Sequence, residues 1–78
     1  MREYLKARRK EKGLKQSDVA ASMGISRNYY NYIEAGKRQS RMDYETMEKL
    51  SKALSLPVKQ IVESEKAYIE SLYQNILA

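Results

Sequence analysis

The 78-residue sequence contains neither cysteine nor histidine. Without cysteine, it holds no disulfide framework, thiolate metal site or cysteine nucleophile. Without histidine, it also lacks the commonest zinc ligand and the commonest acid–base catalyst. The carboxylates Asp18, Glu34 and Asp43 show no paired spacing of the kind that a metal-dependent nuclease needs. The composition therefore predicts no metal, no other cofactor and no enzymatic activity.

Long apolar runs are missing as well. No segment approaches the ~18 apolar residues that a membrane span requires, and residues 1–4 lack the apolar stretch of a secretory signal. We therefore expect a cytoplasmic chain without a membrane partner. The length corresponds to one small domain, which buries only about 60% of the surface of its unfolded chain. Such a domain is marginally stable unless it packs efficiently or gains a partner.

The charge is positive and uneven. Lysine and arginine number 15 against 10 aspartate and glutamate, which gives a net charge of +5. Residues 1–41 contain 11 basic and 4 acidic side chains, whereas residues 42–78 contain 4 and 6. A basic excess in one half of a domain is typical of a surface that faces a polyanion. The alternative is that these side chains only solvate helix faces.

Few residues interrupt helix formation, since the chain has three glycines and one proline. No stretch alternates apolar and polar residues as a half-buried strand does. The breakers and the apolar spacing predict helices over residues 2–12, 16–23 and 27–35, a fourth helix through Met47, Leu50 and Leu54, and a fifth helix that Pro57 opens. The predicted fold class is therefore all-α with five helices, of which the last is continuous and extended.

Local sequence signals define the starts of two of these helices and the buried face of one. Ser26 is a good N-cap for the third helix, and Asp43 is the preferred cap of the fourth, with Ser40 as the alternative. Within the third helix, Tyr30 and Ile33 lie three residues apart, which places them on one face. We expect that face to lie in the core.

The turn between the second and third helices is the central feature of the sequence. The second helix is too short to be stable alone, so its neighbours must brace it. Ala20 is small enough for two helices to cross closely, Gly24 suits a tight turn, and Ser26 starts the next helix. This arrangement suits the insertion of a helix N-terminus into the major groove of DNA.

Residues 1–56 resemble the helix-turn-helix domain of the lambda-repressor/Cro family, the XRE-like regulators. The matching positions lie in each of the first four predicted helices and in the turns between them: Leu5, Arg9, Gly13, Leu14, Gln16, Val19, Ala20, Gly24, Ile25, Ser26, Ile33, Glu34, Gly36, Lys37, Arg38, Leu50, Ala53 and Leu54. The resemblance implies a helix-turn-helix domain over residues 1–56 that binds double-stranded DNA. Residues 57–78 then form a further C-terminal helix.

The resemblance, the exposed helix positions and the basic charge together predict a set of DNA contacts: Gln16, Ser26, Arg27, Asn28, Tyr29, Asn31, Tyr32, Lys37, Arg38 and Arg41. Arginine can donate two hydrogen bonds to guanine, and asparagine can pair with adenine. Tyrosine can contact a thymine methyl group or a phosphate. The basic residues that follow the third helix suit phosphate contacts.

The resemblance also implies a structural ion pair between Arg9 and Glu34, which would join the first and third helices. The sequence departs from the family at Lys15, where the family usually has a threonine or serine N-cap. The usual loop proline after residues 36–38 is absent, and the loop before the fourth helix is about two residues longer than the common pattern.

The C-terminal helix has an apolar stripe that repeats at steps of three and four. The predicted dimerisation residues on it are Val62, Ile69, Leu72, Tyr73 and Ile76. Glu65 falls on the same stripe and interrupts it. An exposed stripe of this length meets another chain or folds back on its own domain. We expect a homodimer, with folding back as the alternative.

These features together predict a sequence-specific, nucleoid-associated transcriptional regulator of a bacterium or phage. We expect a repressor that acts as a homodimer on a palindromic operator, because one short helix reads few bases. The alternative is an antitoxin-like interaction module whose C-terminal helix binds a different protein. A regulatory protein partner is compatible with either hypothesis.

Overall fold

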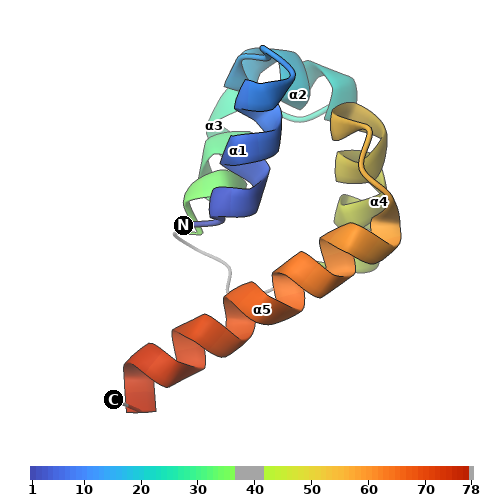
Figure 1. Cartoon of the computed structure of the whole chain (residues 1–78). Coiled ribbons are helices and arrows are strands. Elements are labelled where there is room, and N and C mark those ends of the chain that lie inside the picture. The colour runs from blue at the N-terminus through green and yellow to red at the C-terminus, as the bar shows by residue number, and fades with distance from the viewer. Residues whose placement is uncertain (37–41, 78) are drawn as a thin grey trace.

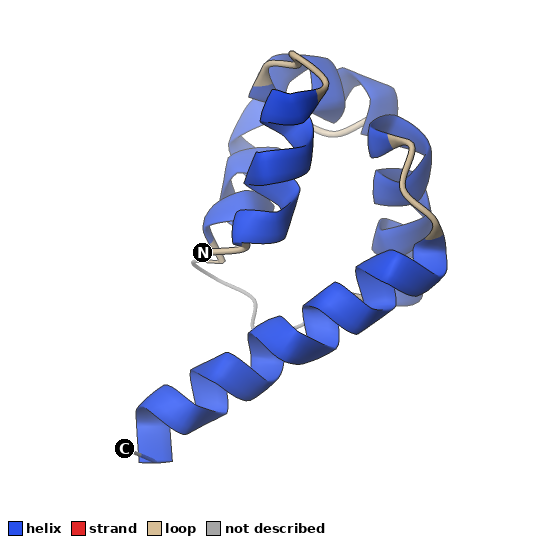
Figure 2. Cartoon of the chain, viewed as in Figure 1, coloured by secondary structure: helices blue, strands red, loops and turns tan. Residues whose placement is uncertain are grey.

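The computed structural model describes residues 1–36 and 42–77, with side chains up to Gln74. Its elements, in chain order, are α1 (Glu3–Glu11), α2 (Gln16–Met23), α3 (Arg27–Ala35), α4 (Tyr44–Leu54) and α5 (Val58–Leu77) (Figure 1). All the regular structure in the described part of the chain is helical (Figure 2). The predicted all-α fold with five helices is therefore confirmed, and the helix boundaries predicted from the sequence agree within one residue.

A left-handed glycine ends α2 and aims the chain into α3. Gly24 has φ +71°, and its backbone N–H donates to the carbonyls of Ala20 and Ala21. The N–H of Ile25 donates to the carbonyl of Ala20 at 3.0 Å. These bonds satisfy carbonyls that the end of a helix otherwise leaves without partners. The turn therefore places the first residue of α3 directly beside the end of α2.

Two side-chain caps that the sequence predicted are confirmed. The Ser26 hydroxyl accepts a hydrogen bond from the backbone N–H of Tyr29 at 3.1 Å, at the start of α3. The Asp43 carboxylate accepts one from the N–H of Thr46 at 2.8 Å, at the start of α4. The alternative cap, Ser40, lies outside the described residues. Such caps stabilise a helix by about 1 kcal/mol each.

The starts of α2 and α5 differ from the prediction in detail. The side chain of Asp18 accepts a hydrogen bond from the backbone N–H of Lys15 at 2.8 Å, so α2 gains a cap from its third residue. Pro57 was predicted to be the first residue of the last helix, but α5 begins at Val58. The Pro57 carbonyl accepts the N–H of Gln60 at 3.0 Å. Proline thus stands just outside the helix, where its missing N–H costs nothing.

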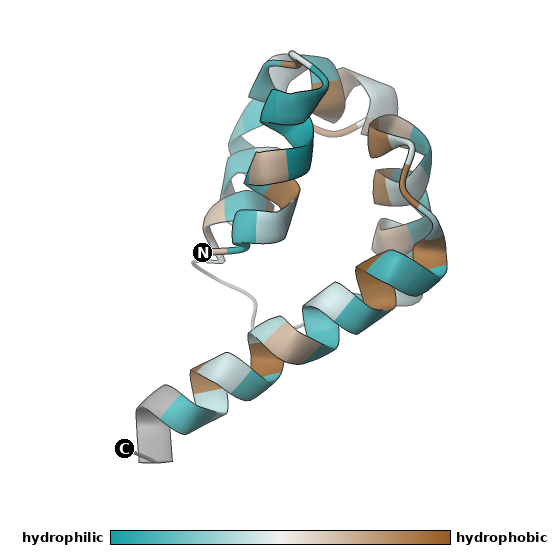
Figure 3. Cartoon of the chain, in the orientation of Figure 1, coloured by the Kyte–Doolittle hydropathy of each residue, from teal (hydrophilic) through white to brown (hydrophobic). Residues whose placement is uncertain are grey.

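The apolar core collects side chains from all five helices. Its buried residues are Leu5, Val19, Ala20, Met23, Tyr30, Ile33, Met42, Leu50, Leu54 and Ile61. The prediction that Tyr30 lies in the core is confirmed, since its side chain is fully buried. Hydrophilic residues dominate α1, whereas apolar residues recur along α4 and α5 (Figure 3). The short helices α2 and α3 are therefore held by packing rather than by their own stability.

The first half of α5 folds back onto the domain, and the second half extends away from it (Figure 1). Ile61 and Glu65 are buried, whereas none of the described side chains between Lys66 and Gln74 is. The sequence placed Glu65 on an outward stripe as an interruption, but its carboxylate turns inward and binds Arg2. The start of α5 thus folds back on the domain, as the alternative to a homodimer predicted. The apolar stripe predicted to dimerise nevertheless stays exposed at Val62 and Tyr73.

A close contact between α5 and the end of α3 generates a prediction about Gly36. Its φ is +68°, and a Cβ there would overlap the hydroxyl oxygen of Tyr68. We expect Gly36→Ala to lower the free energy of unfolding by about 2–3 kcal/mol, from left-handed strain and displacement of the tyrosine. Gly24 is the matched control, because it has a similar φ with open space around it.

Gly24→Ala should therefore cost only the strain, about 1 kcal/mol. Urea unfolding measures both variants, and Tyr68→Phe combined with Gly36→Ala should recover part of the loss in a double-mutant cycle. Equal losses of unfolding free energy at the two glycines would show that Tyr68 does not limit the space at Gly36.

Candidate nucleic-acid interface

The outer side of α3 carries most of the predicted DNA contacts in the described part of the chain. Arg27 and Asn28 form the first turn after the Ser26 cap, and both side chains are exposed. Tyr32 lies four residues beyond Asn28, on the same helix face, and is also exposed. Asn31, between them, is half-buried. The helix thus presents a polar, aromatic and cationic surface at its N-terminal end.

The inner side of α3 is held by an ion pair. Arg9 of α1 donates from Nε and Nη2 to the two carboxylate oxygens of Glu34, each at 3.0 Å. These are the two residues that the family resemblance pairs. Glu34 is buried, and its neighbours on the same face, Tyr30 and Ile33, are buried as well. A bidentate guanidinium–carboxylate contact constrains the relative orientation of the two groups as well as their distance. It therefore constrains the rotation of α3 about its axis.

The Glu34 carboxylate stays ionised despite its burial. Removal from water by itself raises the pKa of a carboxyl group. The hydrogen bonds and positive charge of Arg9, together with the contributions of Tyr30 and Gln16, outweigh that effect and hold the pKa of Glu34 below its usual value. The buried charge is therefore compensated within the fold, and the ion pair persists at neutral pH.

Gln16 connects the start of α2 to the exposed side of α3. Its amide nitrogen donates to the side-chain oxygen of Asn31 at 3.2 Å and to a carboxylate oxygen of Glu34 at 3.3 Å. The residue predicted to brace a DNA backbone is therefore half-buried and holds another predicted contact, Asn31, in place. The two helices present their polar side chains as one connected surface.

The other predicted contacts are divided between two places. The exposed Tyr29 lines a shallow cleft with Asp43 and Thr46 at the start of α4, to one side of Asn28 and Tyr32. The basic residues predicted to contact phosphates after α3 lie outside the described residues: Lys37, Arg38 and Arg41. Lys15, at the start of α2, is exposed and adds a further cation beside Gln16.

Reading the sequence missed the part that Arg2 plays. Its guanidinium is fully buried and donates to Glu65 from α5 and to the carbonyl of Ile33 from α3. One signal was available, because an acidic residue on an apolar helix stripe requires a cation if that stripe is buried. The sequence alone did not identify which of its many basic residues pairs with Glu65.

No group of three or more acidic side chains within residues 1–36 and 42–77 is placed to hold a metal ion. None of the described helices is both long enough and apolar enough to cross a membrane.

A family model described as "Helix-turn-helix" (HTH_3) matches residues 5–61 of the chain. The matched region runs from α1 through the turn and α3 into the first turn of α5. No curated protein and no solved structure matches the sequence. The match therefore covers the elements that build the surface described above.

The Glu34 ion pair predicts an acid-sensitive stability. We expect Glu34→Gln to destabilise the fold by about 3 kcal/mol at pH 7, because it leaves the Arg9 charge without its partner. Since the pKa of Glu34 is lower in the folded than in the unfolded chain, its contribution is complete above about pH 4.3 and is lost as the pH falls through the folded value.

Urea unfolding at pH values between about 7 and 2.5 measures both effects. The variant should lose less stability than the unaltered protein as the pH falls. Glu48→Gln is the control, because Glu48 is an exposed carboxylate on α4. An acid dependence as steep in Glu34→Gln as in the unaltered protein would contradict the prediction.

Proposed function

The chain belongs to the helix-turn-helix family of DNA-binding regulators, and from this premise we propose that it represses transcription by binding a palindromic operator as a homodimer. The single observation that carries the proposal is the placement of α3, which we call the recognition helix. Its first turn is exposed after the Ser26 cap, while its inner face is locked by Glu34. A helix held in this way can enter a groove without changing its orientation.

The chemistry of the exposed turn suits base recognition. Arg27 can donate two hydrogen bonds to guanine, and Asn28 can exchange two with adenine. The N-terminal end of a helix also carries partial positive charge, which favours nearby phosphates. Gln16 and Lys15 lie at the start of α2, where the family geometry places the DNA backbone. Base contacts on α3 and backbone contacts on α2 would together fix the register on the duplex.

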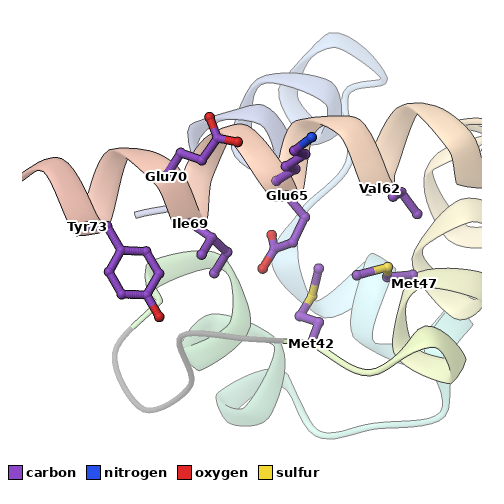
Figure 4. A pocket seen from close by; sticks show the side chains of 8 residues that line it. Met42, Met47, Val62, Glu65, Ile69, Glu70 and Tyr73 are labelled. Atoms are coloured by element: carbon purple, nitrogen blue, oxygen red, sulfur yellow. The ribbon is translucent and has the colours of Figure 1, made fainter.

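The exposed side of α5 supports self-association. A groove of about 360 Å³ lies between this helix and the segment around α4, and it is mainly apolar; its lining residues are Met42, Met47, Val62, Glu65, Lys66, Ile69, Glu70 and Tyr73 (Figure 4). The groove is continuous with the stripe predicted to dimerise. The half-buried Leu72 lies on that stripe, and Ile76 lies beyond the described side chains.

A second copy of the chain is the occupant that the charges of this groove favour. A two-fold interface joins the same patch on both copies, so the patch must complement itself. Lys66 and Glu70 both border the groove, one turn apart. The lysine of one copy can therefore face the glutamate of the other while the apolar side chains of Ile69 and Tyr73 meet. Burying them would also add to a core that is small for one domain.

Repression needs only occupation of the operator. A bound dimer prevents other proteins from using the same stretch of DNA, and this requires no chemical step. Two recognition helices related by a two-fold axis contact half-sites about one helical turn apart, about 34 Å. The proposed mechanism is therefore exclusion, with specificity from the base contacts of two α3 helices.

Selection from random duplexes with the purified protein tests the DNA-binding proposal and supplies the operator. We then expect Arg27→Ala to weaken operator binding by about 1–3 kcal/mol and to relax the preference at one base pair of each half-site. Arg27→Lys keeps the charge but loses the two-pronged donor, so it should relax the preference with a smaller loss of affinity.

Lys59→Ala is the charge-matched control for Arg27→Ala, because it removes one exposed cation from the first turn of α5. Binding to a panel of single-base operator variants at constant salt measures each effect. A uniform loss of affinity on every duplex in Arg27→Ala would contradict base reading by Arg27 and leave it a phosphate contact.

The homodimer predicts a large effect of charge at Ile69. Ile69→Glu places an unpaired carboxylate in the proposed apolar seam, so the variant should be a monomer where the unaltered protein is a dimer. Ser71→Glu adds the same charge at an exposed position of α5 and should leave the dimer intact. Sedimentation equilibrium over a range of concentrations measures the mass of each protein.

An unaltered protein that is monomeric at every concentration, with or without operator DNA, would contradict the homodimer. The groove would then be open to a different protein, as the antitoxin-like alternative requires.

A further inference from the structure

Arg2 is the most completely buried charged residue among those that the structure describes, with no exposed surface. Its Nε and Nη2 donate to the two carboxylate oxygens of Glu65 at 2.9 and 2.8 Å. Its Nη1 donates to the carbonyl of Ile33 at 2.7 Å. The guanidinium also lies 4.8 Å from the ring centroid of Tyr68. Burial of a charge is costly, and this set of contacts compensates it.

These contacts join α5 to the C-terminal end of the recognition helix. Ile33 is in the last turn of α3, whereas Glu65 and Tyr68 lie three residues apart on α5. The backbone N–H of Arg2 donates to the carbonyl of Glu34 at 2.8 Å, so Arg2 grips α3 by both its main chain and its side chain. One residue therefore touches both helices whose relative placement matters in a dimer.

Two tyrosines complete the junction. The hydroxyl of Tyr4, on α1, donates to a carboxylate oxygen of Glu65 at 2.7 Å. The hydroxyl of Tyr68 lies so close to Gly36 that a side chain there would overlap it. Five hydrogen bonds and the contact of Arg2 with the Tyr68 ring thus converge where α5 crosses the end of α3.

Beyond Glu65 the described side chains of α5 are at most half-buried, as Tyr68, Ile69 and Leu72 are. Ile61 belongs to the core one turn earlier, and Glu65 is the last buried side chain of the helix among those described up to Gln74. Apolar packing against α4 favours a range of crossing angles, and a bidentate ion pair adds a directional constraint to it. Arg2 and Glu65 supply that constraint at the last buried position of α5 among the side chains described.

We propose that Arg2 is a positioning residue whose ion pair with Glu65 sets the angle between α5 and the recognition helix, and thereby selects the spacing of the operator half-sites. The proposal rests on the homodimer described above. About 12 residues of α5 follow Glu65, which is a lever of about 18 Å. A tilt of about 10° would move its end by about 3 Å, close to the rise of one base pair.

The test is the dependence of binding on half-site spacing. Operators with the selected spacing are compared with versions that have one base pair added or removed between the half-sites. The affinity for the selected spacing is divided by the affinity for each altered spacing. This spacing ratio is measured for the unaltered protein, Arg2→Lys and Glu65→Gln. We expect each variant to lower this ratio at least about fivefold, because each loses the two-pronged pair.

Arg9→Lys is the matched control. It weakens an ion pair of the same geometry, also buried on its acidic side, but that pair joins α1 to α3 and leaves α5 untouched. Its stability and overall affinity are expected to fall while its spacing ratio stays unchanged. A purely structural role of Arg2 would instead lower affinity on all three spacings alike and keep the ratio.

A second measurement reports the position of the outer end of α5 relative to the rest of the domain and needs no DNA. The chain has no cysteine, so Ser17→Cys on α2 and Gln74→Cys on α5, both at exposed positions, give a unique spin-labelled pair. Labelled protein is diluted into unlabelled protein so that distances within one copy dominate. We expect a narrow distance distribution in the unaltered background and in Arg9→Lys, and a broad or shifted one in Glu65→Gln and Arg2→Lys.

The outcomes separate this inference from the proposed function. An unaltered protein that selects no DNA sequence would overturn the proposed function and this inference with it. Specific binding with an unchanged spacing ratio in both variants, or an unchanged distance distribution, would overturn the inference alone.

Discussion

The buried carboxylate of Glu34 fixes the recognition helix. Arg9 from α1 binds both of its oxygens, Gln16 from α2 donates to one of them, and Arg2 donates to its backbone carbonyl. Three segments that lie apart in the sequence thus meet at one residue of α3. A nine-residue helix gains little stability from its own hydrogen bonds. Its orientation therefore depends on this residue and on the packing beside it.

The two buried ion pairs act on different helices. The pair of Arg9 with Glu34 sets the rotation of α3, and the pair of Arg2 with Glu65 joins the start of the chain to α5. Apolar residues in these places could stabilise the fold as well or better, because buried charges lose their hydration. A bidentate ion pair, however, adds a directional constraint to the crossing angles that apolar packing favours. A small domain that has to present one helix at a fixed angle gains from that specificity.

Features that depend on a few neighbouring residues, such as helix caps, were predictable from the sequence. Contacts between residues far apart in the sequence were not. The Ser26 cap and the burial of Tyr30 follow from local spacing, and both are confirmed. Arg2 and Glu65 are 63 positions apart, and Glu65 read locally as a defect in an outward stripe. Only the fold decides that α5 turns this residue toward the start of the chain. The ten predicted DNA contacts stay predictions, because the structure contains no duplex and describes only part of the loop after α3.

The fold leaves fewer cations unpaired than the 11 basic side chains of residues 1–41 suggest. Of the basic residues in the N-terminal half, Arg2 and Arg9 are neutralised by carboxylates inside the fold, and Arg8 is paired with Glu11 on the surface. A guanidinium paired with a carboxylate contributes little field at the distance of a phosphate backbone, because the two charges cancel. Exposed cations at the helix starts, such as Arg27, therefore count for more than their number implies. The basic residues of the N-terminal half therefore divide into two groups: Arg2, Arg8 and Arg9 form ion pairs within the fold, and exposed cations such as Arg27 face outward, where a polyanion can meet them.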